Sequence, residues 1–372
     1  MNGGSIRKWR EMVKDRIECS VLHSLSMAMD MVRNADERVN WIASIPFFAM
    51  HLVPFLIVFT GITWGSVVLC AVLYVARMFF ITAGYHRYFA HRSYKLGRGM
   101  QFVMALGGSL AAQKGVLWWA GHHRDHHLYA DQPQDIHSPR KGFWWSHIGW
   151  FLSDKFKATP EDRIKDFTMY PELVWLDRYS LVPPTILALG IFLVGGPSAL
   201  VVGFFLSTIL LYHGVFTINS LAHVFGNRRF ATTDTSRNNW LLAMITLGEG
   251  WHNNHHHYRS STNQGFYWWE FDVSFYVLKA LSVFGLVRGI RKPPIEALMK
   301  KRIVKGVFDR GMFEARFAKG ILALERAKAR GGVYYEKKLR KLEKLVARAK
   351  ASAAEISQYM RTVQGLRAGR IC

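Results

Sequence analysis

Cysteine is scarce in this sequence, and the few that occur lie far apart. The 372 residues contain three, Cys19, Cys70 and Cys372. Their spacing fits neither a disulfide framework nor a site in which thiolates hold a metal. Any metal chemistry in this chain therefore has to use other ligands.

Positive charge is missing from two long stretches, 41–76 and 179–227, which contain no Lys or Arg. Each stretch is long enough for two membrane spans of about 20 residues, and turn-forming residues interrupt each one at Gly61–Gly65 and Gly195–Ser198. The sequence therefore predicts an all-α membrane protein with four transmembrane helices in two hairpins. The predicted spans are 42–62, 65–85, 179–194 and 197–221.

The basic residues predict how these spans are oriented. Of the 49 Lys and Arg residues, all but Arg77 lie outside the four spans. By the positive-inside rule, both termini and the segment 86–178 are expected in the cytoplasm, with the chain in the inner membrane of the cell. Residues 1–10 have no apolar core, so no cleaved signal peptide is expected. A soluble protein with buried apolar helices is the alternative.

The chain carries a formal net charge of +23. From Lys300 onward it has 20 basic and 6 acidic residues. Such a balance can indicate nucleic-acid binding, but beside four spans it favours attraction to anionic membrane lipids. We therefore expect lipid partners and no nucleic acid.

Histidine is abundant and clustered. Of 16 histidines, ten lie in the segments HRYFAHR, GHHRDHH and HNNHHH, and His223 follows the last predicted span. All of these segments are expected on the cytoplasmic side of the membrane. Chance would not gather them there.

The spacing within the clusters predicts shared ligand faces. His123, His126 and His127 follow the i, i+3, i+4 pattern of one helical face. The third cluster repeats this pattern at 252, 255 and 256. His86 and His91 are five residues apart, about 140° on an α-helix, which suits opposite sides of a site or a helix that ends between them.

The eight histidines with these spacings and His223 make nine imidazoles. This number exceeds the three or four protein ligands of a zinc site. They fit two metals with four or five nitrogens each. Iron, copper, nickel and zinc all accept nitrogen ligands, and open positions for oxygen favour iron.

The apolar segment 99–120 could be taken for a fifth span. A crossing there would put the second histidine cluster on the opposite side of the membrane from the first. Gln113, Lys114 and the pair Trp118–Trp119 instead predict a helix that lies in the membrane interface.

The segments HRYFAH, HRDHH, NSLAH and HNNHH, with DIHSPRKGFWWSHIGW between them, resemble the membrane-bound fatty acyl desaturases of the stearoyl-CoA (delta-9) desaturase family, in its bacterial branch. The resemblance runs from about residue 41 to residue 291. It suggests three parts: an N-terminal cytoplasmic or interfacial segment 1–40, a desaturase domain 41–295 with a cytoplasmic helical cap, and a basic helical tail 296–372.

The resemblance implies a centre of two ferrous ions. Its ligands would be His86, His91, His123, His126, His127, His223, His252, His255 and His256. Asn219 matches a position that holds one iron through a water, whereas His122 and His257 fall outside the ligand spacing. Asp125 and Glu249 lie near the clusters and are expected to orient imidazoles through the second ring nitrogen.

The implied reaction inserts a cis double bond between carbons nine and ten of a saturated acyl chain, using O₂ and two electrons. A membrane alkane or fatty-acid hydroxylase is the nearest alternative. A metal transporter, a protein of another class, would carry its histidines within the spans near the midplane.

The resemblance also implies substrate contacts. Gln113 and Trp119 match residues of the acyl tunnel, and Val215 stands where animal members carry Thr. Arg140 and Lys141 match a basic pair near the tunnel mouth, able to neutralise a phosphate of coenzyme A or of a phospholipid. The face of the second span adds Tyr74 and Met78 as candidates that limit the length of the acyl chain.

The electrons are expected from a separate protein. The chain has no His-Pro-Gly-Gly signature of a fused cytochrome b5 domain, no cysteine set for an iron–sulfur cluster and no glycine-rich dinucleotide loop. A ferredoxin or a cytochrome b5-like protein with its reductase would suit, and an acidic donor would be attracted to the basic cytoplasmic face.

The tail carries an apolar stripe at heptad spacing from Tyr335 to Val363. This stripe predicts either a weak coiled coil or an amphipathic helix that packs on the membrane or on the enzyme. Its positions after Tyr335 are Leu339, Leu342, Val346, Ala349, Ala353, Ile356, Met360 and Val363.

Overall fold

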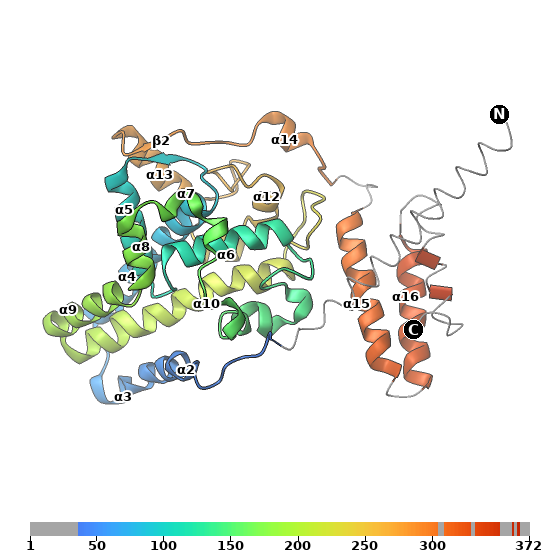
Figure 1. The fold of residues 1–372 in the computed structure, drawn as a ribbon, viewed down its shortest axis with the longest axis horizontal. Helices are drawn as coiled ribbons and strands as arrows, with labels where there is room; N and C mark the ends of the chain where they lie inside the picture. The colour runs from blue at the N-terminus through green and yellow to red at the C-terminus, as the bar shows by residue number, and fades with distance from the viewer. Residues whose placement is uncertain (1–35, 304–308, 329–331, 350–358, 361–362, 365–372) are drawn as a thin grey trace.

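The computed structural model describes residues 36–303, 309–328, 332–349, 359–360 and 363–364. In this part the chain is mostly helical, as predicted (Figure 1). One small antiparallel sheet pairs β1 (Lys95–Leu96) with β2 (Val287–Arg288) and joins two segments that are far apart in the sequence. Most of the predicted N-terminal segment 1–40 lies outside the described residues.

The first apolar stretch forms two helical runs separated at a glycine. The first comprises α2 (Ile45–Leu52), η1 (Val53–Leu56) and α3 (Ile57–Thr60), and it ends at Gly61, whose φ is 68°. The second run begins at α4 (Trp64–Phe79), capped by the Thr63 side chain, and continues as η2 (Phe80–Ala90). The break therefore falls in the predicted turn.

The second apolar stretch also contains a break. α9 (Val182–Ser198), η7 (Ala199–Leu206), α10 (Ser207–Ser220) and η8 (Leu221–His223) follow one another directly. Gly196 interrupts this run because its backbone, with φ 70° and ψ −167°, is not helical, and α9 packs back against η7. The Ser198 hydroxyl donates to the carbonyl oxygen of Gly61 over 3.1 Å, so the two breaks lie together.

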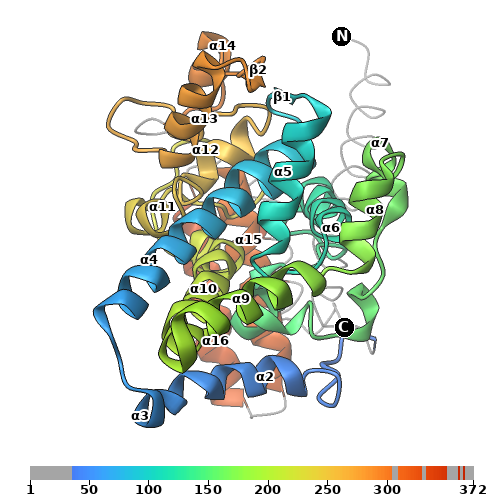
Figure 2. The same cartoon turned by 90° about the vertical axis from the view of Figure 1, so that its left-hand side faces the viewer.

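Among the described residues, two helices are long and apolar enough to cross a membrane, Trp64–Ala90 and Val182–His223, and Ile45–Thr60 is a shorter apolar helix. Their outer surfaces expose large apolar side chains, among them Phe59 at 85% and Val194 at 93%. Apolar surface on this scale indicates contact with lipid or with another protein. Figure 2 shows α4 and α10, which pack against each other.

The segment 99–120 is not one helix. α5 (Arg98–Ser109) ends before a turn in which Ala112 and Lys114 adopt positive φ, and α6 (Val116–Tyr129) begins after it. Both helices pack against η2. The segment is therefore a helical hairpin beside the site, and the prediction of a single interfacial helix is wrong in this respect.

The remaining elements, which we call the cap, are the short helices that precede α9 and those that follow η8. Between α6 and α9 they are η3 (Pro139–Lys141), η4 (Trp145–Gly149), η5 (Asp154–Phe156), η6 (Glu161–Arg163), α7 (Lys165–Thr168) and α8 (Pro171–Arg178). After η8 they are α11 (Trp240–Ile245), α12 (His252–His257), α13 (Val273–Val283) and α14 (Ile295–Met299). The largest buried apolar cluster is centred on η2 and includes Tyr85 and Phe89.

The tail folds as a pair of helices, α15 (Arg310–Lys328) and α16 (Gly332–Ala347), to one side of the cap in Figure 1. The stripe residues Leu339, Leu342 and Val346 pack in one buried cluster with Phe317 and Leu324 of α15. The described part of the stripe therefore faces the preceding helix, α15, a partner that the sequence reasoning did not name. Ala353 and Ile356 lie outside the described residues.

Candidate metal centre

The first pair of histidines is brought together by an unusual helix. η2 is wound with π-type turns, and the amide of His91 donates to the carbonyl oxygen of His86, five residues earlier, over 3.1 Å. This bond places the two side chains one turn apart, and their Nε2 atoms are 3.1 Å apart. Of the two alternatives predicted for this pair, opposite sides of the site is wrong because it assumed an α-helical turn, whereas a helix does end between the two residues, at Ala90. π-turns are rare and occur frequently at functional sites.

The other two clusters lie on helices with the predicted spacing. α6 carries His123, His126 and His127, and α12 carries His252, His255 and His256. His223 lies in η8, at the end of the long apolar run.

The nine histidines divide into two groups in which the possible ligand atoms lie within 4.8 Å of one another. The first group is His86, His91, His123, His127 and His255. The second group is His126, His223, His252 and His256. α6 and α12 each contribute to both groups, so the two groups are neighbours.

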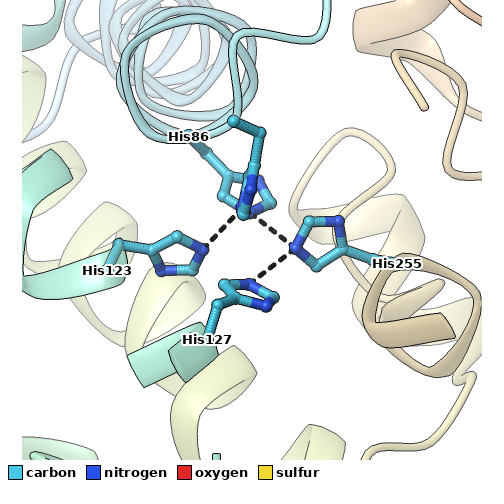
Figure 3. Close-up of side chains that lie close together, drawn as sticks. His86, His123, His127 and His255 are labelled. Atoms are coloured by element: carbon cyan, nitrogen blue, oxygen red, sulfur yellow. Dashed lines mark hydrogen bonds between the residues drawn. The ribbon is translucent and has the colours of Figure 1, made fainter. Parts of the chain in front are cut away.

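The first group forms a close ring of nitrogen atoms. The Nε2 atom of His255 lies 3.1 Å from that of His86 and 2.9 Å from that of His127. The Nε2 atom of His123 lies 3.0 Å from that of His91. Figure 3 shows His86, His123, His127 and His255 pointing toward a common point.

Buried carboxylates hold four of the imidazoles through their Nδ1 atoms. Glu249 lies 2.5 Å from His86 in the first group. In the second group, Asp135 and Asp234 each lie 2.9 Å from an imidazole, and Asp131 lies 3.5 Å from the third. Their partners are His126, His256 and His223 respectively.

These contacts define which nitrogen faces the centre. A carboxylate accepts a hydrogen bond from Nδ1–H, so Nε2 of the same neutral ring presents a lone pair. The Nε2 atoms of His126 and His256 are buried and have no hydrogen-bond partner. Converging, unpartnered lone pairs are the arrangement that a cation satisfies. The residues present therefore fit a nitrogen-bound metal pair.

The pKa values of five of the nine histidines indicate neutral imidazoles. Burial, followed by the charge of neighbouring imidazoles, holds the pKa of five histidines well below its usual value; these are His91, His123, His127, His252 and His255. Burial alone raises the pKa of Asp234, but the charge and hydrogen bond of His256 outweigh it and hold that pKa well below its usual range. A neutral imidazole backed by an ionised carboxylate is the form that binds metal.

Glu249 is itself held in place by a buried cation. Arg87 donates from Nε to Glu249 over 3.0 Å and from Nη1 to Asp272 over 2.8 Å, and all three side chains are buried. Glu249 is therefore fixed where it contacts Nδ1 of His86, the position that its predicted orienting role requires. Its pKa is lowered because His86 and Arg87 together outweigh the effect of burial.

Asp125 lies elsewhere. Its carboxylate pairs with Arg163 over 2.6 Å, so the expectation that it orients an imidazole is wrong. α6 turns Asp125 away from the face that carries His123 and His126. The sequence reasoning missed Asp131, Asp135 and Asp234, although the first two follow the HRDHH segment by only a few residues.

The two histidines outside the ligand spacing have structural contacts. His122 packs against Trp118 with ring centroids 4.6 Å apart, and burial lowers its pKa to about 4. His257 stacks on Phe230 at 3.9 Å, and its Nε2 lies 2.6 Å from the carbonyl oxygen of Ala297. His137, which the sequence reasoning did not select, lies near His126 with ring centroids 4.1 Å apart, and the two histidines form a third group of possible ligands with Asp135.

A largely apolar cavity of about 480 Å³ adjoins the first group at His123. Its lining includes Gln113, Trp119, Val215 and Asn219, four of the residues singled out in the sequence. We call it the acyl-side cavity, because Gln113, Trp119 and Val215 are predicted to line an acyl tunnel. Apolar side chains make up most of its wall. Among these are Phe47, Met50, Tyr212 and Phe216.

Four other predicted substrate residues do not line this cavity. Arg140 and Lys141 line a different cavity, and the Lys141 ammonium is buried against Glu37 at 2.7 Å, so the expected place at the tunnel mouth is wrong for this pair. The basic side chains of the acyl-side cavity are Lys114 and Lys157, both exposed.

Tyr74 and Met78, the candidates that limit the length of the acyl chain, contact α10 at Gly214. The Tyr74 hydroxyl donates to the carbonyl oxygen of Ile245 over 2.6 Å, and Met78 is fully buried. Both approach Gly214, where a Cβ atom would lie 2.9 Å from the Tyr74 oxygen. Val215, the next residue, lines the cavity. The proposed effect on chain length therefore stays a prediction.

Comparison with known proteins identifies the class. The sequence model described as fatty acid desaturase matches residues 62–283, and the chain belongs to this family. Its members are oxidoreductases that desaturate fatty acyl chains, and so is this enzyme.

Three relatives narrow the comparison. The chain is 34% identical to the sn-1 stearoyl-lipid 9-desaturase of Anabaena variabilis over 71% of its length and 98% of the relative. It is 36% identical to the sn-1 stearoyl-lipid 9-desaturase of Synechocystis over 70% of its length and 83% of the relative. It is also 36% identical to the acyl-CoA C20 Delta5-desaturase of Anemone leveillei, over 62% of its length and 75% of the relative.

Proposed function

We propose that this enzyme introduces a cis double bond between carbons nine and ten of a saturated acyl chain, at a centre of two ferrous ions. The observation that supports this most directly is the pair of imidazole groups beside the acyl-side cavity. The names of the two cyanobacterial relatives support the position of the double bond.

In this proposal each imidazole group holds one iron. His86, His91, His123, His127 and His255 would bind the first. His126, His223, His252 and His256 would bind the second, with Asn219 acting through a water. When bound, the two irons supply the oxygen activation that removes hydrogen from an unactivated methylene, which no side chain can deprotonate.

The protein's own residues orient the centre and the substrate. Glu249, Asp131, Asp135 and Asp234 fix the ring orientation and tautomer of their imidazoles, which strengthens the ligands. The apolar walls of the acyl-side cavity exclude water and hold the methylene chain beside His123. Pockets of this size and polarity are typical of small-molecule sites.

The carrier of the acyl chain is recognised at the exposed end of the cavity. Lys114 and Lys157 supply positive charge there, suited to a phosphate group. The relatives' names include both acyl-lipid and acyl-CoA enzymes, and both carriers contain phosphate. The assay below distinguishes them.

We also propose the predicted topology, with four spans in the inner membrane and the histidine centre on the cytoplasmic side. The contact between Gly61 and Ser198 supports it, because two hairpin tips on the same side of a membrane can touch. The electrons would come from a separate donor protein.

Product analysis in a desaturase-deficient host tests this function. We expect gas chromatography with mass spectrometry to show a cis monoene with the double bond at carbon nine. The purified enzyme, given its iron and a reducing system, is then assayed with stearoyl-CoA and with a stearoyl phospholipid to identify the carrier. A hydroxylated product would indicate the alternative hydroxylase reaction, and an unaltered lipid profile would contradict the proposal.

A further inference from the structure

A second cavity, of about 790 Å³, lies between the C-terminal helices and the cap. On the cap side it is lined by η3, Phe143 and the end of the long apolar run, and on the other side by α15 and α16. Seven of its lining residues are basic and none is acidic: Arg140, Lys141, Arg237, Arg316, Lys319, Arg326 and Lys338. We call it the tail cavity.

The basic lining continues on the other side of α15. A neighbouring cavity of about 720 Å³ shares Arg237 and Arg316 with the tail cavity and adds four more basic residues, Arg228, Lys341, Lys344 and Arg348. Its acidic lining residue, Asp309, pairs with Arg228 at 2.7 Å. Positive charge therefore extends over both sides of α15.

This surface lies close to the metal centre. His223, a member of the second imidazole group, is itself part of the tail-cavity lining. The tail cavity shares no lining residue with the acyl-side cavity. A partner bound at the tail could therefore approach the second group while an acyl chain occupies the other cavity.

The desaturation reaction needs such a partner. Two C–H bonds and O₂ give one C=C bond and two waters, and the balance requires two electrons and two protons in addition. The two protons come from water, and the electrons come from two molecules of a reduced one-electron donor, each of which is oxidised once. Because the sequence shows no haem-binding His-Pro-Gly-Gly signature, no cysteine set for an iron–sulfur cluster and no glycine-rich dinucleotide loop, we take the donor to be a separate protein.

We propose that the C-terminal helical pair is the docking platform for an acidic redox protein that delivers these electrons beside His223. The proposal rests on the proposed function and extends it to a binding surface. A small anion would need one cavity, whereas basic residues on both sides of α15 match the broad acidic face of a protein. The family match ends at residue 283, before α15 begins, so the platform is an addition to the desaturase domain.

Charge reversal on α15 tests the proposal. The test variant combines R316E, K319E and R326E, three exposed positions outside both imidazole groups. A matched control reverses three exposed basic residues that line neither cavity, K165E, K279E and R288E. Full-length protein in neutral-lipid nanodiscs is titrated with a [2Fe–2S] ferredoxin and, separately, with a soluble cytochrome b5 domain.

We expect the test variant to raise the Kd of at least one donor about tenfold at low ionic strength, and the control to change it little. The difference should shrink as salt is added. Binding is measured by surface plasmon resonance, which does not depend on iron loading. In steady-state turnover the same variant should raise the KM for the donor and leave the KM for the acyl substrate unchanged.

A single turnover started with chemically reduced enzyme bypasses the donor. The test variant should form as much product as the wild type in this assay. Loss of product from the wild type would contradict the proposed function, whereas normal product with unchanged donor Kd in the variant would contradict only the docking proposal. A raised KM for the acyl substrate would assign the tail cavity to the acyl carrier, and an effect seen only in anionic nanodiscs would assign it to lipid; either result overturns the proposal.

Discussion

The two imidazole groups differ in how their charge is arranged. The first has five imidazoles and one carboxylate partner, Glu249, which is shared with the buried Arg87. The second has four imidazoles and three aspartates, none of which pairs with a buried cation as closely as Glu249 pairs with Arg87. The second group therefore has more negative charge per ligand. In the proposed di-iron centre, the first group would therefore hold its metal mainly by the number of its ligands and the second mainly by the negative charge of its carboxylates.

Removing a ligand should have the largest effect. His255→Ala removes the imidazole that lies between His86 and His127 in the first group. We expect desaturation to fall below detection and the iron content of the purified protein to fall from two per chain toward one. Elemental analysis and product chromatography measure the two results. His122→Ala is the control and should retain activity, because His122 packs among aromatic rings.

Removing a carboxylate should reduce iron binding less than removing a ligand does, and it should weaken one imidazole group more than the other. Asp234→Asn keeps the shape of the side chain but removes the charge that holds His256. Loss of such a partner typically costs about 10–100-fold in metal affinity, and iron should leave the second group first when chelator is added. Asp125→Asn is the matched control, because Asp125 pairs with Arg163. Equal chelator sensitivity of the two variants would contradict the role given to Asp234.

Acid should destabilise the metal-free protein in a window set by the histidines. Five imidazoles have folded-state pKa values well below the ordinary value of 6.5, because burial disfavours their charged form. Below pH 6.5 the unfolded chain binds protons that the folded chain does not, so stability falls as pH falls. His223 opposes this trend, since Asp131 outweighs burial and raises its pKa.

We expect the melting temperature of chelator-treated protein to decrease between pH 7.5 and pH 5.5, measured by light scattering or intrinsic fluorescence in detergent. Iron-loaded protein should show a weaker dependence until acid displaces the metal. A melting temperature that rises on acidification would contradict the neutral state of these five imidazoles.

Narrowing the acyl-side cavity should leave both groups intact and change only the substrate preference. Val215→Phe adds bulk to the cavity wall one helical turn before Asn219. We expect preference to shift toward shorter acyl chains by about tenfold in relative kcat/KM, the scale of one or two methylenes in an apolar pocket. Competition between palmitoyl and stearoyl substrates measures the shift, with unchanged iron content as the control.

The sequence predicted the parts of the site that depend on regular α-helical spacing. α6 and α12 carry their histidines where a 3.6-residue repeat puts them, and the breaks at Gly61 and Gly196 follow from glycine in apolar runs. Spacing on one helix is local information, so it can be read directly from the chain.

The parts that were missed depend on contacts between distant segments or on irregular backbone. Asp234 contacts a histidine 22 residues away, and Lys141 pairs with Glu37 across 104 residues. Neither partner can be chosen from spacing alone. The prediction for Asp125 was wrong because it chose a carboxylate close in sequence to the histidines. The fold pairs Asp125 with Arg163 and brings more distant carboxylates such as Asp234 to the imidazoles.

The wide-turned helix η2 has a consequence for the rest of the molecule. Each residue of an α-helix turns the chain by about 100°, so the number of residues between a ligand and an apolar helix fixes the rotational phase between them. η2 follows α4 directly and ends at Ala90, just before His91. Deleting one residue from η2 would therefore rotate the exposed apolar side of α4, which carries Val68 and Val72, toward the protein interior while the imidazoles stayed in place. The π-type turns of η2 therefore set the rotation of α4 relative to the imidazoles. One continuous helix can in this way expose apolar side chains along α4 and place metal-ligand histidines at its end.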